Sequence, residues 1–190
     1  RDGELVHTGG SGTSRDGEDR VPDADTVFRI ASMTKSFTAA TILLLRDEGR
    51  LRLDDRAADF VPELAGWAGP TADSRPITIR DLLTHTAGIS YGFGPAQDQW
   101  KAAGIQGWYF ADRSEPVSAV VERMAALPMD SQPGEKYVYG YNTDILGVVV
   151  EKVSGLTLAE FIQKRIASPL GLVDTQFYLP PAQKDRLATV

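Results

Sequence analysis

The sequence predicts a single domain of mixed α/β (α+β) class that is built mainly from helices. Two observations carry this prediction. Apolar residues recur at helical spacing through most of residues 77–167, and short strand-like stretches occur only near the two ends of the chain. The length of 190 residues, with 42% hydrophobic residues, is enough for one domain with a real core.

Three short stretches are expected to form strands. They are Leu5-Val6-His7, Val27-Phe28-Arg29-Ile30 and residues 175–179. A loop rich in Gly, Ser, Asp and Arg separates the first two. Three short strands make a poor sheet, because a sheet needs more partners to be stable on its own.

A central helix is predicted over residues 32–48, directly after the second strand. Its apolar residues lie nearly all round the helix, which is typical of a helix buried on every side. Arg46-Asp47-Glu48 ends the run in water, and Gly49 supplies the terminating residue.

The middle of the chain carries signals that start and end helices. Residues 66–76 form a linker rich in Gly, Pro, Asp and Ser, and Thr78 with Asp81 then predicts a capped helix start. Residues 88–112 are aromatic without a clear period. They predict an ordered loop that either lines a pocket or folds on its own side chains.

Three further helices follow from spacing and caps. The positions that support them are Val117, Val120, Val121 and Met124; Ile145 to Val153 with Gly155 as the stop; and the capping box of Thr157 and Glu160, whose helix runs to about Ala167. We therefore divide the single domain into residues 1–76, with the N-terminal strands and first helix, residues 77–168, a mostly helical part, and residues 169–190, which return toward the sheet.

The composition excludes several classes of function. A net charge of -6 without a basic cluster argues against a nucleic-acid or anionic-membrane partner. The chain has no cysteine and only two histidines, His7 and His85, which excludes a thiolate metal site and a His-rich metal site. We expect no metal and no cofactor. No apolar run reaches about 18 residues, which predicts no membrane span. No signal peptide is visible, and a bacterial cytoplasmic, periplasmic or secreted location is left open.

The run Ser32-Met33-Thr34-Lys35 opens the predicted central helix. Residues three apart share a helix face, with Cβ atoms roughly 5–6 Å apart, so the Lys35 amine can reach the Ser32 hydroxyl. Serine needs such a base to become a nucleophile. We expect desolvation to lower the pKa of Lys35, and the Ser32 N–H to help stabilise an oxyanion. A solvated lysine at a helix N-terminus is the alternative for the bare pattern.

A dense polar and aromatic turn, residues 132–144, precedes the helix that begins near Ile145. A tyrosine beside a lysine ammonium loses its proton more easily, and the resulting tyrosinate is a general base that could serve Ser32. Simple packing of the tyrosines is the alternative.

Four stretches in this order resemble the serine β-lactamase and penicillin-binding-protein-like hydrolases, most of all the family VIII carboxylesterases and class C β-lactamases. They are Phe28 to Lys35, Leu51 to Asp55, Ile79 to Gly88 and Pro133 to Gly147. The resemblance implies an antiparallel sheet flanked by helices plus a mostly helical subdomain. It also implies that Ser32 is the acylated nucleophile, Lys35 its proton partner and Tyr139 the tyrosine of the second motif; the division of labour between Lys35 and Tyr139 stays open.

The second motif departs from the family pattern. Most β-lactamases and peptidases carry Tyr-x-Asn, whereas this chain has Tyr139-Gly140-Tyr141 with Asn142 one place late. This favours an esterase of small or short-chain carboxylic esters. A β-lactamase or D-Ala-D-Ala carboxypeptidase-like peptidase, and a non-catalytic binding relative or inactive fragment, are the alternatives. Tyr141 and Trp108 are candidate substrate-binding residues, although packing explains them equally well.

The family's third motif has no candidate before Val190. We therefore expect an incomplete domain, with a missing C-terminal segment or a second chain completing the sheet. His85 and Asp81 lie around a short helix and are expected to be structural.

Overall fold

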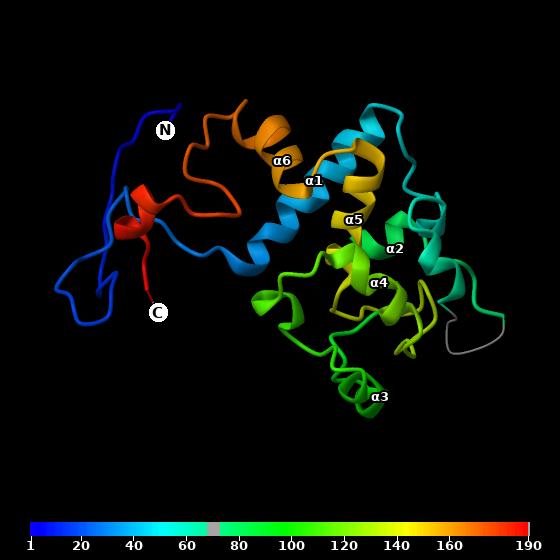
Figure 1. Cartoon of the computed structure of the whole chain (residues 1–190). Coiled ribbons are helices and arrows are strands. Elements are labelled where there is room, and N and C mark those ends of the chain that lie inside the picture. Colours follow the sequence, from blue (N-terminus) through cyan, green and yellow to red (C-terminus); the bar gives the residue numbers. More distant parts are fainter. Residues whose placement is uncertain (68–72, 190) are drawn as a thin grey trace.

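The computed structural model describes residues 1–67 and 73–189, and its framework is helical (Figure 1). The α-helices are α1 (Thr34–Asp47), α2 (Ile79–Leu83), α3 (Gln97–Ala102), α4 (Val117–Ala125), α5 (Asn142–Ser154) and α6 (Leu158–Ile162). Short 3-10 helices cover Ala31–Met33, Ala57–Asp59, Pro62–Gly66, Tyr109–Asp112 and Pro181–Arg186, and a π-helical turn, Gln163–Ala167, extends α6.

Helix α5 lies at the centre of the packed region. It contacts α1, α2, α4 and α6, and its residues 145–150 are all buried. The sequence explains this position, because Ile145, Leu146 and the three following valines give α5 an apolar surface on nearly every side. Figure 1 shows α1 and α5 side by side, with α2 and α4 below them.

The capping signals in the sequence are confirmed. Thr78 and Asp81 form a reciprocal capping box at the start of α2, and Thr157 and Glu160 form another at the start of α6. Gly155 ends α5 with a φ of +74°, a left-handed conformation that glycine adopts without strain.

The three predicted strands are wrong. Within the two described ranges the backbone forms only isolated bridges, one joining Val27 in parallel to Leu187 and one joining Arg56 to Thr78. Leu5 and Val6 are 77% and 76% exposed. A strand satisfies its backbone only by pairing with a neighbour, and within the described ranges the pairing of these segments is limited to the single bridge at Val27. The expected antiparallel sheet is therefore not formed by the described residues.

Helix α1 is not buried all round, which corrects a second expectation. Ile42 and Leu45 are fully buried against the helical core, but Leu43 remains 37% exposed and Phe37 is half-buried. The apolar run does form the predicted helix, but the surface of α1 at Phe37 and Leu43 is partly exposed to solvent.

The aromatic stretch 88–112 contains a short α-helix, α3, and a 3-10 helix, Tyr109–Asp112, neither of which was predicted from the sequence. Trp100 on α3 is fully buried, and its ring stacks on that of Tyr141 at 5.9 Å between centroids. Six residues are too few to show a helical period, so the prediction of a loop was natural. Part of the predicted linker 66–76 lies outside the described residues.

The two ends of the chain lie together, away from the helical core (Figure 1). The amide of Val27 donates to Arg186 O at 2.8 Å, and the amide of Ala188 donates to Val27 O at 2.8 Å. The described helices include none with the length and apolarity needed to cross a bilayer.

Candidate active site

The side chains of Ser32, Lys35 and Tyr139 converge on one atom. Lys35 Nζ donates a hydrogen bond to Ser32 Oγ at 3.1 Å, and the Tyr139 hydroxyl donates to the same Oγ at 3.0 Å. Ser32 and Tyr139 are 107 residues apart in sequence. The three predicted site residues are thus brought together at one solvent-accessible point.

Ser32 is presented by a strained piece of backbone. It lies in the 3-10 turn that leads into α1, and the preceding residue, Ala31, has a φ of +45°. An alanine in this left-handed region carries a strain of about 1–3 kcal/mol, and such strain concentrates at functional sites. This backbone conformation leaves Ser32 exposed in the turn just before α1 instead of within the helix.

Tyr139 is held by a close approach between its turn and the segment after α2. The Val138 amide donates to His85 O at 2.7 Å. A Cβ on Gly140 would lie 2.3 Å from Ile89 O, so only glycine fits beside Tyr139. The turn can therefore reach across the core and place the tyrosine hydroxyl over α1.

The interactions of Lys35 with the neighbouring tyrosines correct the expectation that the pKa of Lys35 is lowered. Burial alone would lower this pKa, but hydrogen bonding and charge interactions with Tyr139 and Tyr91 outweigh burial and raise it. The pKa of Tyr139 is lowered, chiefly by its hydrogen bond with Ser32 and then by Lys35. Lys35 therefore stays an ammonium, and Tyr139 is the group that ionises more easily than usual.

Tyr91 is a site residue that the sequence analysis did not single out. Lys35 Nζ lies 6.0 Å from the centroid of its ring, and the ring meets Tyr139 edge-on at 5.5 Å. Burial raises the pKa of Tyr91, so it remains a neutral neighbour of the ammonium. The aromatic richness of residues 88–112 was the only signal, and no motif spacing distinguishes Tyr91 within it.

Asp144 is a second residue whose role was missed. It lies in the first turn of α5, where burial raises the pKa of its carboxyl to about 6 against the opposing effect of Lys35. The charge of this carboxyl also contributes to raising the pKa of Tyr91, and it partly opposes the lowering of the pKa of Tyr139. Asp144 is therefore a nearby negative charge that favours the ammonium and disfavours the tyrosinate.

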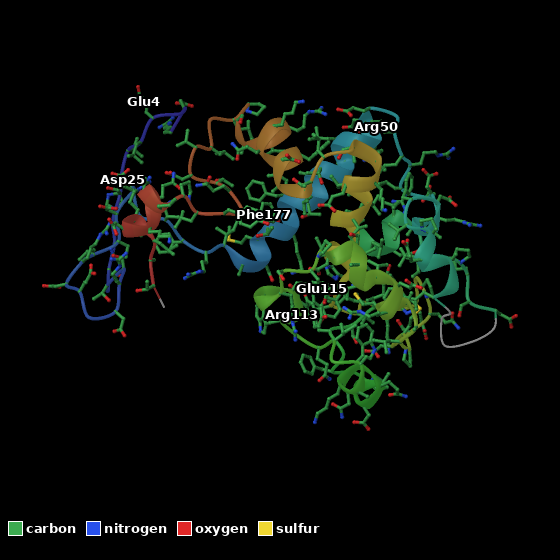
Figure 2. The ribbon with its side chains drawn as sticks, in the orientation of Figure 1. Glu4, Asp25, Arg50, Arg113, Glu115 and Phe177 are labelled. Atoms are coloured by element: carbon green, nitrogen blue, oxygen red, sulfur yellow. The ribbon has the colours of Figure 1, made fainter. Side chains whose placement is uncertain are left out.

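Tyr141 and Trp108, the two candidate substrate-binding residues, are not brought to Ser32. Tyr141 is 1% exposed; its hydroxyl donates to Gly107 O at 3.1 Å, and its ring packs edge-on against Tyr91 at 4.7 Å. Trp108 is 80% exposed and borders a small hollow with Tyr109 and Arg113. Figure 2 shows Arg113 close to Glu115, on the segment before α4.

Asn142 and Asp81 have structural surroundings. Asn142 is fully buried and its amide donates to Ile89 O at 3.0 Å, so the displaced asparagine of the second motif faces the core instead of Ser32. Burial raises the pKa of Asp81, but the hydrogen bonds from Arg75 and Thr78 outweigh this and lower it overall.

An apolar groove of about 840 Å³ opens beside Ser32. It is lined by Ala31 and Thr34 on either side of Ser32, by Phe37 of α1, and by Phe28 and Phe177 from the two ends of the chain. In Figure 2, Phe177 lies on the segment that faces α1. The site therefore borders a space large enough for a small organic molecule.

Comparisons with known proteins find esterases among the relatives of this chain. The chain is 38% identical to the lovastatin esterase of Penicillium rubens over 96% of its length and 33% identical to Esterase EstB of Burkholderia gladioli over 99%. These alignments cover 48% and 47% of the two esterases, so the chain spans about half the length of these curated relatives.

A solved structure described as EstCE1, a hydrolase with promiscuous acyltransferase activity, superposes with a TM-score of 0.81 at 29% identity. The superposition covers 94% of this chain and 46% of EstCE1. These similarities confirm the β-lactamase and transpeptidase-like fold and the resemblance to family VIII esterases. Because the family described as Beta-lactamase matches residues 1–190, the chain belongs to the β-lactamase family.

Proposed function

We propose that this protein is a serine hydrolase that cleaves small carboxylic esters through an acyl-enzyme on Ser32. The observation that carries the proposal is the double hydrogen bond to Ser32 Oγ from Lys35 and Tyr139. A nucleophile with an adjacent proton acceptor and a third group that tunes the acceptor is the arrangement that acyl transfer requires.

In the proposed reaction, ionised Tyr139 takes the proton of Ser32 as Oγ attacks the ester carbonyl carbon. The Ser32 N–H is our candidate for one of the donors to the developing oxyanion. When the carbon–oxygen bond to the alcohol breaks, Tyr139 returns the proton to the leaving oxygen. Water then attacks the acyl carbon and loses a proton to Tyr139. As the bond between that carbon and Oγ breaks, Tyr139 passes this proton to Ser32 Oγ. Lys35 remains an ammonium throughout and stabilises the tyrosinate.

An ester substrate is supported by the chain's departures from the β-lactamase pattern and by its relatives. The asparagine that would meet an amide is absent from the site, because Asn142 is buried in the core. The names of two relatives, lovastatin esterase and Esterase EstB, describe ester cleavage. We propose that Trp108 contacts the substrate. Its loop is held by a hydrogen bond from the Gly107 amide to Tyr91 O at 2.9 Å. We propose that Tyr141 contributes indirectly, by packing against the ring of Tyr91.

Acyl transfer to an alcohol is a second candidate, favoured by the description of EstCE1 as having acyltransferase activity. In that case an alcohol replaces water in the second step, and the roles of Ser32 and Tyr139 do not change.

We also propose the division into residues 1–76, 77–168 and 169–190, with a further segment or a second chain adding strands beside the ends. The isolated parallel bridge between Val27 and Leu187 supports this, because a single bridge is the smallest unit of the backbone pairing from which a sheet is built. The apolar side chains of Phe28 and Ile30, 55% and 36% exposed, supply a surface for such strands.

The test compares hydrolysis of p-nitrophenyl butyrate and nitrocefin by the wild type and two variants. We expect ester hydrolysis well above nitrocefin hydrolysis, and Ser32→Ala to abolish both. Ser36→Ala is the matched control, because Ser36 is exposed one turn further along α1. Full activity of Ser32→Ala would contradict the proposal, and faster nitrocefin turnover would favour the β-lactamase alternative. Butyryl transfer to added alcohol would support the second candidate.

A further inference from the structure

His85 lies against the Tyr139 ring, outside the group of residues assigned to the reaction. The centroids of the two rings are 4.9 Å apart with an interplanar angle of 31°, and the ring of Tyr137 lies 5.7 Å from the imidazole. His85 is 9% exposed, so its ring is enclosed by protein. Tyr139, in contrast, is 42% exposed and needs support on one side to hold its hydroxyl on Ser32.

The backbone of His85 serves the same turn. Its carbonyl accepts the Val138 amide at 2.7 Å, immediately before Tyr139. His85 has a φ of +55°, a left-handed conformation that histidine and asparagine adopt more readily than most residues. Ring and backbone thus contact Tyr139 and its neighbour from one residue.

Asn142 determines which tautomer of His85 fits. Its Nδ2 lies 3.0 Å from Ile89 O, 3.2 Å from Val138 O and 3.1 Å from His85 Nδ1. Turning the amide over would place its oxygen against two carbonyl oxygens, so the amide nitrogen must face them. An N–H on His85 Nδ1 would then point at another donor. The proton of His85 is therefore on Nε2, and the imidazole is neutral.

The charges around the imidazole favour the same neutral form. Burial lowers the pKa of His85, and the Lys35 ammonium on α1 lowers it further. The other titratable groups packed against the ring are the phenols of Tyr137 and Tyr139. A second cation here would oppose Lys35, whereas a neutral ring leaves the Lys35–Tyr139 interaction undisturbed.

We propose that His85 is a positioning residue whose neutral imidazole supports the Tyr139 ring and keeps its hydroxyl on Ser32 Oγ and close to Lys35. The inference rests on the proposed function in one respect, since it takes Tyr139 as the proton acceptor. Its structural core, the dependence of Tyr139 on the His85 ring, can be measured without any substrate.

The test is an ultraviolet titration of tyrosinate in wild type and His85→Asn. Asparagine tolerates the left-handed backbone of position 85 but removes the ring. Subtracting the titration of the matching Tyr139→Phe protein isolates Tyr139 from the other five tyrosines. We expect the Tyr139 pKa to rise in His85→Asn, because its hydroxyl leaves Ser32 and Lys35. We expect Ser32 labelling by a fluorophosphonate to slow by about 10²-fold, the size of effect that a 1 Å misplacement can produce, and its pH profile to move upward in parallel.

Two further variants separate positioning from stability. His85→Phe keeps a flat ring, and Ile89 O and Val138 O can take both amide protons of Asn142, so it should restore the Tyr139 pKa. Val120→Ala, in the buried face of α4, should lower Tm without moving that pKa. If His85→Asn lowers Tm but leaves the Tyr139 pKa at its wild-type value, the proposal is overturned. If the pKa shifts but wild type is never labelled at Ser32, the positioning role stands and the proposed function fails.

Discussion

The helices around α5 and the two ends of the chain behave differently, although both carry apolar residues. Around α5, the side chains of Ile145 and Phe161 are almost fully buried. At the ends, which Figure 1 shows apart from the helical core, the exposed fractions are 76% for Val6 and 84% for Tyr178. A helix satisfies its backbone within its own segment, whereas a strand depends on a partner elsewhere. The difference teaches that local sequence signals are sufficient for the first region and insufficient for the second.

The candidate site joins these two regions. Ser32 follows directly from the exposed N-terminal end, and Lys35 lies on the first turns of α1, whereas Tyr139 comes from the turn before α5. Activity should therefore depend on side chains from both regions, and stability mainly on the region around α5.

The largest expected effect is on the chemistry. Tyr139→Phe keeps the ring against His85 but removes the hydroxyl that we propose as the proton acceptor, so ester hydrolysis should fall by about 10²–10⁴-fold. Far-ultraviolet circular dichroism should stay unchanged. Tyr178→Phe, at an exposed position of the C-terminal end, is the control and should retain full activity. A Tyr139→Phe protein as active as this control would remove Tyr139 from the reaction.

The contrast in stability is the next largest effect. Ile145→Ala leaves a cavity in the core of α5 and should lower the free energy of unfolding by about 2–5 kcal/mol. Leu5→Ala, at a side chain that is 77% exposed, should change it by less than about 0.5 kcal/mol. Urea unfolding measures both. Equal losses would mean that the N-terminal end is packed in solution as tightly as the region around α5.

Asp144 links the pH dependence of stability to the site. Its folded pKa, about 6, lies above the ordinary value of 3.8, so its contribution to stability is fully present below pH 3.8 and is lost as the pH rises through 6. Asp144→Asn should therefore stabilise the protein by about 1–3 kcal/mol at pH 8 and have little effect at pH 4. Thermal unfolding at the two pH values checks this. An equal gain at both would exclude ionisation of Asp144 as the cause.

The smallest effects concern the helix caps. Thr78→Ala and Thr157→Ala each remove a capping side chain and should cost about 0.5–2 kcal/mol in the free energy of unfolding. Thr78→Ala should cost the more of the two, because its hydroxyl donates to the buried Asp81, whereas the hydroxyl of Thr157 donates to the exposed Glu160. Thr8→Ala, at an exposed end position, is the control. Urea midpoints that rank Thr8→Ala beside the two caps would contradict the role of the capping boxes.

Much of the helical region was predictable, for a physical reason. A cap such as Thr78 with Asp81, or a stop such as Gly155, acts on residues three or four places away, so its effect is written in the local sequence. The pairing of Ser32 with Lys35 was equally local. Tyr139 was reached only through the family resemblance, because no local rule joins residues 107 positions apart.

The features that could not be predicted depend on which residues lie around a side chain or a strand in the folded protein. The pKa of Lys35 was expected to be lowered, because burial was visible in the sequence, whereas the opposing interactions with Tyr139 and Tyr91 depend on how the chain folds. Tyr91 itself comes from a stretch without a period. The strand at Val27 was expected from its composition, but its state depends on partners that composition cannot specify.

The most direct test of the central claim is the pH dependence of fluorophosphonate labelling, followed by intact mass and peptide mapping, in wild type and Lys35→Met. If Lys35 and Tyr139 activate Ser32 as described, wild type gains one adduct on Ser32. Lys35→Met should then react more slowly, with its profile moved to higher pH, because the pKa of Tyr139 loses its neighbouring ammonium. An adduct on another residue, or an identical profile in both proteins, would contradict the account.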